Sequence, residues 1–222
     1  MTETLTLAEL LAVTRPAQRK GERTRARILE SAAAIMAKDG VHNLKVLDVC
    51  SAAHISAGTF YNHFSDRDAM CEEVLLRVID SLTDDILVGG NQTDDPFPAI
   101  LETNTRYIQL FVSAGPLNRA VQQLVDGSDR VRDAWRASNA RIAGHIAAGA
   151  ARRTGLAPDL TAAFAAQAML DGVLMQYFAW EDDSVRDAFG DVDELAYRVS
   201  VLWYRLLYRA DPPVAAHHGS AP

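Results

Sequence analysis

A segment near the N-terminus, residues 46–70, reads VLDVCSAAHISAGTFYNHFSDRDAM and carries the most informative pattern in the chain. It predicts two short helices, over 46–53 and 57–63, joined by a three-residue link. Ile55 in the link is apolar enough to pack under the turn, and Ser56 is placed to cap the second helix. Two short helices joined by so tight a turn are typical of a helix-turn-helix.

The second of these helices has an apolar inner face and a polar outer face. Phe60 and Phe64 lie four residues apart and form the inner face. Outer hydroxyl, amide and imidazole groups suit base edges and phosphate oxygens, and two cations would flank the groove. We expect contacts to DNA from Lys45, Ser56, Ala57, Gly58, Thr59, Tyr61, Asn62, His63 and Arg67. Ser65 and Asp68 form a capping-box pattern that predicts the start of the next helix.

Charge is distributed unevenly along the chain. The net charge is −7, yet residues 15–45 hold eight Lys or Arg and three acidic residues, +5, leaving −12 on the remainder. Arg23 and Arg25 lie at the start of the predicted helix 22–39, where the helix dipole disfavours cations by about 0.3–1 kcal/mol each. A phosphate backbone would reverse that preference, so we expect both to contact DNA. A merely solvated basic face is the alternative.

The chain as a whole is predicted to be all-α. Apolar residues repeat at helical spacing between Gly and Pro breaks, and no stretch alternates with period two. The expected helices cover 22–39, 46–53, 57–63, 66–88, 97–113, 116–126, 129–153, 158–181 and 191–209.

Composition excludes several classes of protein. The chain contains no run of 18 apolar residues, so no membrane span is predicted. The first residues lack the features of a secretory signal, and a cytoplasmic protein is therefore expected. Two cysteines, Cys50 and Cys71, form neither a disulfide framework nor a metal motif. We therefore expect no cofactor and no metal.

Residues 22–75 resemble the N-terminal domain of the TetR (tetracycline-repressor-like) family of bacterial regulators. The resemblance rests on Ile28-Leu29 through Gly40 and on residues 46–70, with Gly-Thr-Phe-Tyr-x-His-Phe in register. It implies a homodimer that binds double-stranded DNA, and a C-terminal domain that binds a small effector. The implied division is a flexible extension over 1–20, a DNA-binding domain over 21–66, an effector and dimerisation domain over 67–210, and a mobile tail over 211–222.

Three residues depart from the family's pattern. His54 stands where the family usually has glycine, and a left-handed backbone there would cost about 1 kcal/mol. Cys50 replaces an alanine and is small enough to pack. Lys45 stands where a threonine commonly caps the helix.

The C-terminal half predicts a dimer interface and a ligand site. The helix expected over 191–209 is apolar on two faces, which favours burial on both sides, by its own core or by a partner. For an interface we expect Leu170, Leu174, Val199, Trp203, Leu206 and Leu207; a thicker monomeric core is the alternative. Aromatic, Met and amide side chains predict a largely apolar effector pocket, or plain core, at Asn104, Tyr107, Phe111, Trp135, Asn139, Met169, Met175, Tyr177 and Phe178.

The function expected from the sequence is transcriptional regulation. We expect a repressor, found in the bacterial cytoplasm and on the nucleoid when bound to DNA, that an apolar or aromatic effector releases from a pseudo-palindromic operator. A dimeric regulator without an effector is the first alternative. A ligand-binding helical protein or an enzyme is the second, although no nucleophile-elbow, phosphate-loop or HExxH motif occurs.

Overall fold

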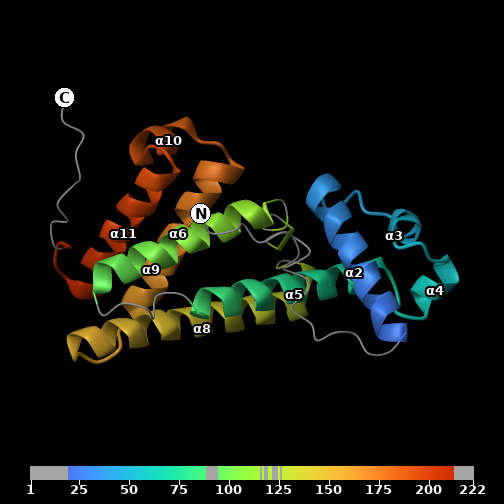
Figure 1. Ribbon diagram of the computed structural model, residues 1–222, viewed down its shortest axis with the longest axis horizontal. Coiled ribbons are helices and arrows are strands. Elements are labelled where there is room, and N and C mark those ends of the chain that lie inside the picture. Colours follow the sequence, from blue (N-terminus) through green and yellow to red (C-terminus); the bar gives the residue numbers. More distant parts are fainter. Residues whose placement is uncertain are drawn as a thin grey trace. The chain divides into compact units, whose positions relative to one another are not determined.

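A computed structural model describes residues 20–88, 95–115 and 127–212, with residues 117, 120, 121 and 125 between them. All regular structure in these residues is helical, which confirms the all-α prediction (Figure 1). The predicted extension over 1–20, most of the helix over 116–126 and the tail beyond residue 212 lie outside the described residues. The helices are α2 (Lys20–Asp39), α3 (Val46–Ala52), α4 (Ala57–Tyr61), α5 (Arg67–Val88), α6 (Pro96–Ala114), α8 (Asp129–Thr154), α9 (Leu160–Leu174), η1 (Met175–Ala179), α10 (Asp183–Phe189) and α11 (Val192–Tyr208).

The chain packs as two compact units. Unit 1 comprises residues 1–87 and 107–142, and unit 2 comprises residues 88–106 and 143–222. Helices α6 and α8 each contribute residues to both units. None of the described helices is long and apolar enough to cross a bilayer.

The core of unit 1 is built on the apolar face of α2. Ile28, Ala32 and Met36 are fully buried, as their spacing predicts, and Gly40 ends the helix with a φ of +79°. The same core includes Phe60 of α4 and continues into α5, where more apolar side chains are buried: Met70, Cys71, Val74, Leu75 and Val78. The apolar packing therefore crosses residue 66, where the sequence suggested a boundary; that boundary stays a prediction.

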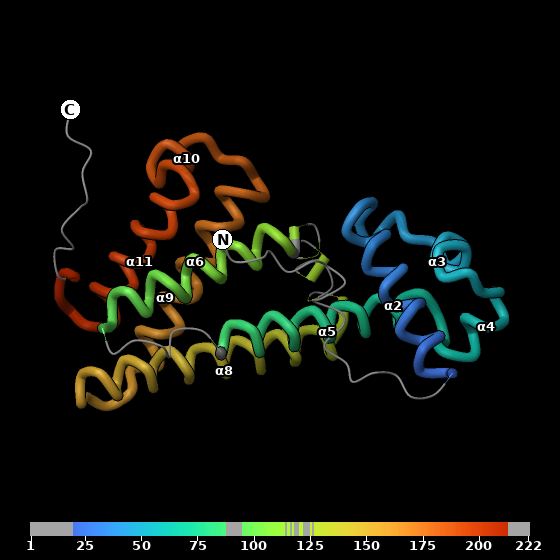
Figure 2. Tube along the Cα trace, viewed as in Figure 1, coloured from blue at the N-terminus to red at the C-terminus, as the bar shows by residue number. Residues whose placement is uncertain are grey.

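Two long helices lie side by side in unit 1 and run in the same direction (Figure 2). Glu72 of α5 pairs with Arg130 of α8 at 3.3 Å, and Asp84 pairs with Arg141 at 2.8 Å further along both helices. Between these ion pairs the buried hydroxyls of Thr83 and Ser138 share a hydrogen bond. Because exposed pairs contribute little, the apolar packing along α5 provides most of the stability.

The start of α5 differs from the predicted capping box of Ser65 and Asp68. Asp66 is the residue whose carboxylate accepts from the backbone N–H of Ala69, at 2.8 Å. The Ser65 hydroxyl donates to that same carboxylate instead of capping the helix. These two hydrogen bonds hold the pKa of Asp66 below its usual value.

In unit 2 the predicted helix over 158–181 is divided. Helix α9 begins after Asp159, whose carboxylate accepts from the N–H of Ala162, and it continues as the single π-turn η1. Glu181 then adopts a left-handed φ of 54°, which ends the helical path. The short helix α10 that follows was not predicted, because its seven residues include none that are buried.

Four of the residues predicted at a dimer interface are buried inside the chain's own core. Leu170 and Leu174 of α9, and Val199 and Trp203 of α11, are at most 5% exposed. Their burial inside one chain argues against direct contact with a second chain, and their assignment to an interface stays a prediction. Helix α11 is apolar on two faces, as expected, and one of these faces covers the core of unit 2.

Candidate nucleic-acid interface

The turn between α3 and α4 is fixed by backbone hydrogen bonds. The N–H of Ile55 donates to the carbonyl of Cys50 at 3.0 Å, and the N–H of His54 donates to that of Ser51 at 3.2 Å. This is a Schellman arrangement, which requires a left-handed residue at its centre. His54 occupies that position with a φ of 52°, as the departure from glycine predicted. Cys50 and Ile55 complete it by packing into the apolar core.

The N-terminus of α4 is capped by Ser56, as predicted. Its hydroxyl oxygen accepts from the N–H of Thr59 at 3.1 Å and also hydrogen-bonds to the Thr59 hydroxyl at 2.9 Å. The second bond orients the hydroxyl that sequence reasoning assigned to base reading. Lys45, at the equivalent position before α3, makes no side-chain cap, so its ammonium group remains directed to solvent.

Aromatic packing anchors α4 to the core. Phe60 is completely buried and Phe64 nearly so, and their ring centroids lie 5.7 Å apart. The rings of Tyr61 and Phe60 pack edge to face with their centroids 5.3 Å apart, and Tyr61 is 59% exposed. The phenol of Tyr61 is therefore presented to solvent from a rigid base. Helix α4 ends at Tyr61, two residues earlier than predicted, so that Asn62 and His63 lie just after it.

Arg25 differs from the other predicted DNA contacts because its guanidinium bonds to residues far from it in the sequence. It forms a two-bond ion pair with Glu73 of α5, donates to the carbonyl of His63, and lies 4.1 Å from the centroid of the Phe64 ring. Arg77 also pairs with Glu73 at 3.1 Å. These contacts join α2 and α5 to the end of the α4 segment, so Arg25 supports the interface from behind.

The remaining predicted residues differ in exposure. Arg67 is half-buried and pairs with the adjacent Asp68 at 2.7 Å. Arg23 and Lys45 are exposed and form no ion pair with any described residue, which leaves both charges available to phosphate. Of the other residues, Ser56, Gly58, Tyr61 and Asn62 are exposed, and Ala57, Thr59 and His63 are half-buried.

Sequence reasoning missed one residue near this surface. Leu47 of α3 is 71% exposed, the largest exposed fraction among the large apolar side chains described. Helical periodicity places a leucine on the buried face of a helix. The signal that Leu47 lies outside is its position one residue after Val46, on a helix of barely two turns.

The nine residues predicted to hold an effector fall in both units. Tyr107, Phe111, Trp135 and Asn139 belong to unit 1, and the others belong to unit 2: Asn104, Met169, Met175, Tyr177 and Phe178. Trp135 packs against the core of unit 1. The fully buried Asn104 donates to the Ser200 hydroxyl at 3.1 Å, and Tyr177 donates to the carbonyl of Gly190 at 2.7 Å. These three side chains have structural partners, and the effector assignment of all nine stays a prediction.

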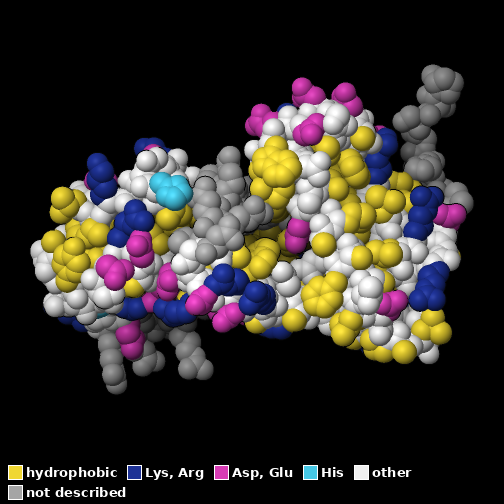
Figure 3. Space-filling view, turned by 180° about the vertical axis from the view of Figure 1, so that it is seen from behind, with side chains coloured by type: hydrophobic (Ala, Val, Ile, Leu, Met, Phe, Trp, Pro, Cys, Tyr) yellow, Lys and Arg dark blue, Asp and Glu magenta, His cyan; other side chains and the backbone are white. Residues whose placement is uncertain are grey.

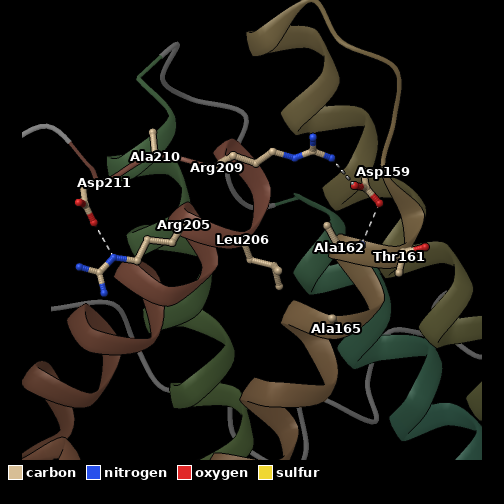
Figure 4. A pocket seen from close by; sticks show the side chains of 9 residues that line it. All are labelled: Asp159, Thr161, Ala162, Ala165, Arg205, Leu206, Arg209, Ala210 and Asp211. Atoms are coloured by element: carbon tan, nitrogen blue, oxygen red, sulfur yellow. Dashed lines mark hydrogen bonds and ion pairs between the residues drawn. The ribbon is translucent and has the colours of Figure 1, made fainter.

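One cavity within unit 2 is wide and charged at its rim (Figure 4). It measures about 650 Å³ and lies between the start of α9 and the end of α11. Its arginines are each matched by a carboxylate: Arg205 pairs with Asp211 at 2.6 Å, and Arg209 pairs with Asp159 at 3.5 Å. Leu206, which is 39% exposed, projects into the hollow between these pairs. This cavity is therefore a neutralised surface groove with an apolar floor.

A second cavity within unit 2 is small and has basic side chains. It measures about 50 Å³ and is lined by residues of α6, α8 and α11. Its polar lining residues are Thr103, His145, Arg152, Arg153, Trp203 and Tyr208. None of the nine predicted effector residues lines either of these two cavities.

Comparisons with known proteins agree on one family. Residues 28–74 match the model of bacterial regulatory proteins of the tetR family. The chain is 33% identical over 60 residues to the HTH-type transcriptional regulator UidR of Escherichia coli K12, covering 27% of this chain and 31% of UidR. It is 29% identical over 99 residues to the HTH-type transcriptional repressor KstR2 of Rhodococcus jostii, covering 43% and 48%. The matches thus span 31% of UidR and 48% of KstR2, less than half the length of either curated relative.

Solved structures share the fold over most of the chain. Salmonella enterica GusR superposes with a TM-score of 0.66 at 20% identity, covering 87% of this chain and all of GusR. A TetR-family transcriptional regulator from Streptomyces coelicolor gives a TM-score of 0.68 at 15% identity, covering 83% and 80%. At these identities the likeness establishes the shared architecture alone.

Proposed function

Because this chain belongs to the tetR family of bacterial regulatory proteins and carries that family's helix-turn-helix, we propose that it is a dimeric, effector-released repressor. The observation that carries the proposal is the presentation of α4. A capped, aromatically anchored helix holds Thr59 and Tyr61 at the surface, and Arg23 on α2 and Lys45 just before α3 are exposed cations of the same unit. Such a helix enters the major groove, and flanking cations bind phosphate.

Repression is the mode we propose. It is supported by KstR2, which is named as a repressor. We place the protein in the bacterial cytoplasm, and on the nucleoid when it is bound to its operator. Two recognition helices would then enter successive major grooves about 34–36 Å apart, on a pseudo-palindromic operator.

The proposed dimer would use the outer face of α9 and α11. This face exposes apolar side chains, with Phe164 44% exposed, Leu202 37% and Leu206 39%. Figure 3 shows hydrophobic side chains spread over the surface of unit 2, below a group of acidic side chains. An exposed apolar surface of this kind on paired helices favours a self-complementary interface. Leu206 and the half-buried Leu207 are the two originally predicted residues that this proposal keeps.

Oligomeric state tests that surface directly. Leu206→Asp should convert the dimer to a monomer in sedimentation equilibrium, because a second chain would have to bury the carboxylate. Val112→Asp is the matched control, since Val112 is 50% exposed and lies in unit 1. A Leu206→Asp protein that remains dimeric would show that another face forms the interface.

The proposed effector acts by mass action on two dimer states. It releases DNA only to the extent that it binds more tightly to the state whose recognition helices no longer fit successive grooves. A regulator without an effector remains the second candidate. Thermal unfolding separates the two, because a ligand that binds only the native state must raise the Tm.

The decisive experiment is selection of genomic DNA fragments by the purified full-length protein at physiological salt. Recovery of a short palindrome with half-sites one helical turn apart supports the proposal. Tyr61→Ala and Lys45→Ala should then weaken binding to all sequences and reduce the salt slope, whereas Thr59→Ala should relax the sequence preference. Recovery of random fragments only would exclude operator-specific regulation.

A further inference from the structure

The small cavity in unit 2 contains a buried donor without an acceptor. Trp203 is 5% exposed and lines the cavity, and its indole Nε1–H has no hydrogen-bond partner within the described structure. Buried donors are nearly always paired, because an unsatisfied one costs about 1–3 kcal/mol. The hydroxyl of Thr103, a second lining residue, donates to the carbonyl of Ala99 and keeps its own lone pairs. An occupant that accepts a hydrogen bond would satisfy the indole.

The charge around this cavity is one-sided. Arg152, Arg153 and His145 line it, and no Asp or Glu does, although the chain as a whole carries −7. Arg152 is exposed and forms no ion pair with any described residue. The two arginines also lie in the last turn of α8, where the helix dipole favours cations, so helix stability explains their presence in part. It does not explain why Arg152 has no carboxylate partner among the described residues.

Tyr208 adds a further donor to this lining. Burial raises the pKa of its phenol, so the hydroxyl stays protonated at neutral pH. Its ring stacks on Tyr204, with centroids 4.8 Å apart, which fixes its position. The remaining wall is apolar and includes Ile100, Ile146 and Leu207. Cationic and N–H donors beside an apolar wall match a ligand with one anionic end and one apolar end.

We propose that this cavity binds the carboxylate of a small apolar monocarboxylic acid. The volume of about 50 Å³ is far below the roughly 300–1,000 Å³ of a drug-sized site, so the cavity holds the carboxylate head group and the alkyl chain extends beyond it along the apolar wall. The carboxylate oxygens accept from the indole of Trp203 and pair with Arg152, and the alkyl group lies against Ile100 and Leu207. That the acid is also the effector rests on the proposed function; that it binds here does not.

The test uses hexanoate as the probe and 1-hexanol as its uncharged counterpart. Isothermal titration of the full-length protein should show hexanoate binding at least about ten times more tightly than hexanol, because a charge-assisted pair is lost with the alcohol. Arg152→Gln should weaken hexanoate binding at least about five-fold and leave hexanol unchanged. Arg136→Gln, which removes an exposed charge from the same helix outside the cavity, should change neither.

A second variant guards against a purely electrostatic result. Trp203→Phe keeps an aromatic ring, although a smaller one, and removes the indole donor, so it should also weaken hexanoate binding, provided that circular dichroism shows an intact fold. Equal affinities for hexanoate and hexanol would overturn the proposal, as would equal effects of Arg152→Gln and Arg136→Gln. Those results would assign the cavity to ordered water.

DNA binding separates this inference from the proposed function. Hexanoate binding that meets these criteria but leaves the operator complex intact supports the site and refutes its role as effector. Hexanoate binding by a protein that selects no operator supports the site and refutes the proposed function. Operator selection without hexanoate binding refutes the site alone.

Discussion

Replacing Arg25 with methionine separates a structural arginine from one that contacts DNA. Methionine keeps an unbranched apolar stem and removes the two-bond pair with Glu73, the donation to the His63 carbonyl and the contact with the Phe64 ring. Glu73 is not left alone, because Arg77 pairs with it at 3.1 Å. The decrease in the free energy of unfolding should therefore stay well below the 3–5 kcal/mol typical of breaking a fully buried ion pair.

The contacts of Arg25 set the expected size of the destabilisation in Arg25→Met. Charge-assisted hydrogen bonds contribute about 1.5–3 kcal/mol when well shielded, and exposed pairs about 0–1 kcal/mol. The side chain of Arg25 is 35% exposed and that of Glu73 is 24% exposed, so a value between these ranges applies. We expect Arg25→Met to lower the free energy of unfolding by about 1–2 kcal/mol, a fall in Tm of roughly 2–8 °C for a chain of this size.

Urea unfolding and the salt dependence of DNA binding measure the two roles separately. Arg25→Met should lower the urea midpoint and leave the salt slope unchanged. Arg23→Met is the matched control, since Arg23 is exposed on the same helix without an ion pair to a described residue. It should leave stability within about 0.5 kcal/mol and reduce the slope by about 0.9, the value for one phosphate contact.

The opposite pattern would refute this assignment. If Arg25→Met kept full stability and reduced the salt slope, the guanidinium would have to leave Glu73 and contact phosphate. A double-mutant cycle with Glu73→Gln gives an independent check, because contacting partners couple by about 0.5–3 kcal/mol. A coupling energy near zero would show that the ion pair contributes nothing to the fold.

Four further variants test the helix-turn-helix and the core that it packs on. His54→Gly should raise the free energy of unfolding, measured in urea titrations, by up to about 1 kcal/mol. Glycine relieves the strain of the left-handed backbone, and the greater entropy of its unfolded chain offsets part of that gain. A lower free energy of unfolding would show that the imidazole makes a stabilising contact. Phe60→Ala should lower the free energy of unfolding by about 3–5 kcal/mol and abolish DNA binding, because Phe60 is buried. Tyr61→Ala, at the exposed neighbouring position, should leave the free energy of unfolding nearly unchanged. Similar losses for both variants would contradict the burial of Phe60. Burial raises the pKa of the Cys71 thiol from 9.0 to about 11, so the folded state holds its proton more tightly and stability should fall as pH rises from about 9 towards 11. Thermal melts of Cys71→Ala should show a smaller alkaline loss than the unaltered protein, and an equal loss would assign the effect to other groups.

Local chemistry made the helix-turn-helix predictable. A serine before a short helix, two phenylalanines four residues apart and a non-glycine residue at a turn each determine a hydrogen bond, a buried face or a dihedral angle within a few residues. Ser56, Phe60 and His54 accordingly adopt the predicted roles. The N-cap of α5 was misassigned because Ser65 and Asp66 are adjacent and both can cap.

The partners of Arg25 and the faces of α9 and α11 could not be predicted in the same way. Arg25 and Glu73 are 48 residues apart, and no local pattern specifies that they meet. On α11 two apolar stripes were recognised, but periodicity does not say which stripe faces the chain's own core. Packing within unit 2 buries Val199 and Trp203 and leaves Leu202 and Leu206 outside.

Sequence alone predicted the all-α class, the position of the helix-turn-helix and the outward set of side chains around Thr59 and Tyr61. These follow from helix periodicity, capping and turn geometry, which act over a few residues. Three features emerged from the folded chain: Arg25 supports the interface, Phe164 and Leu206 remain exposed, and Trp203 brings a buried donor to a cavity with basic walls. Those outcomes depend on distant segments competing for the same space and the same hydrogen-bond partners.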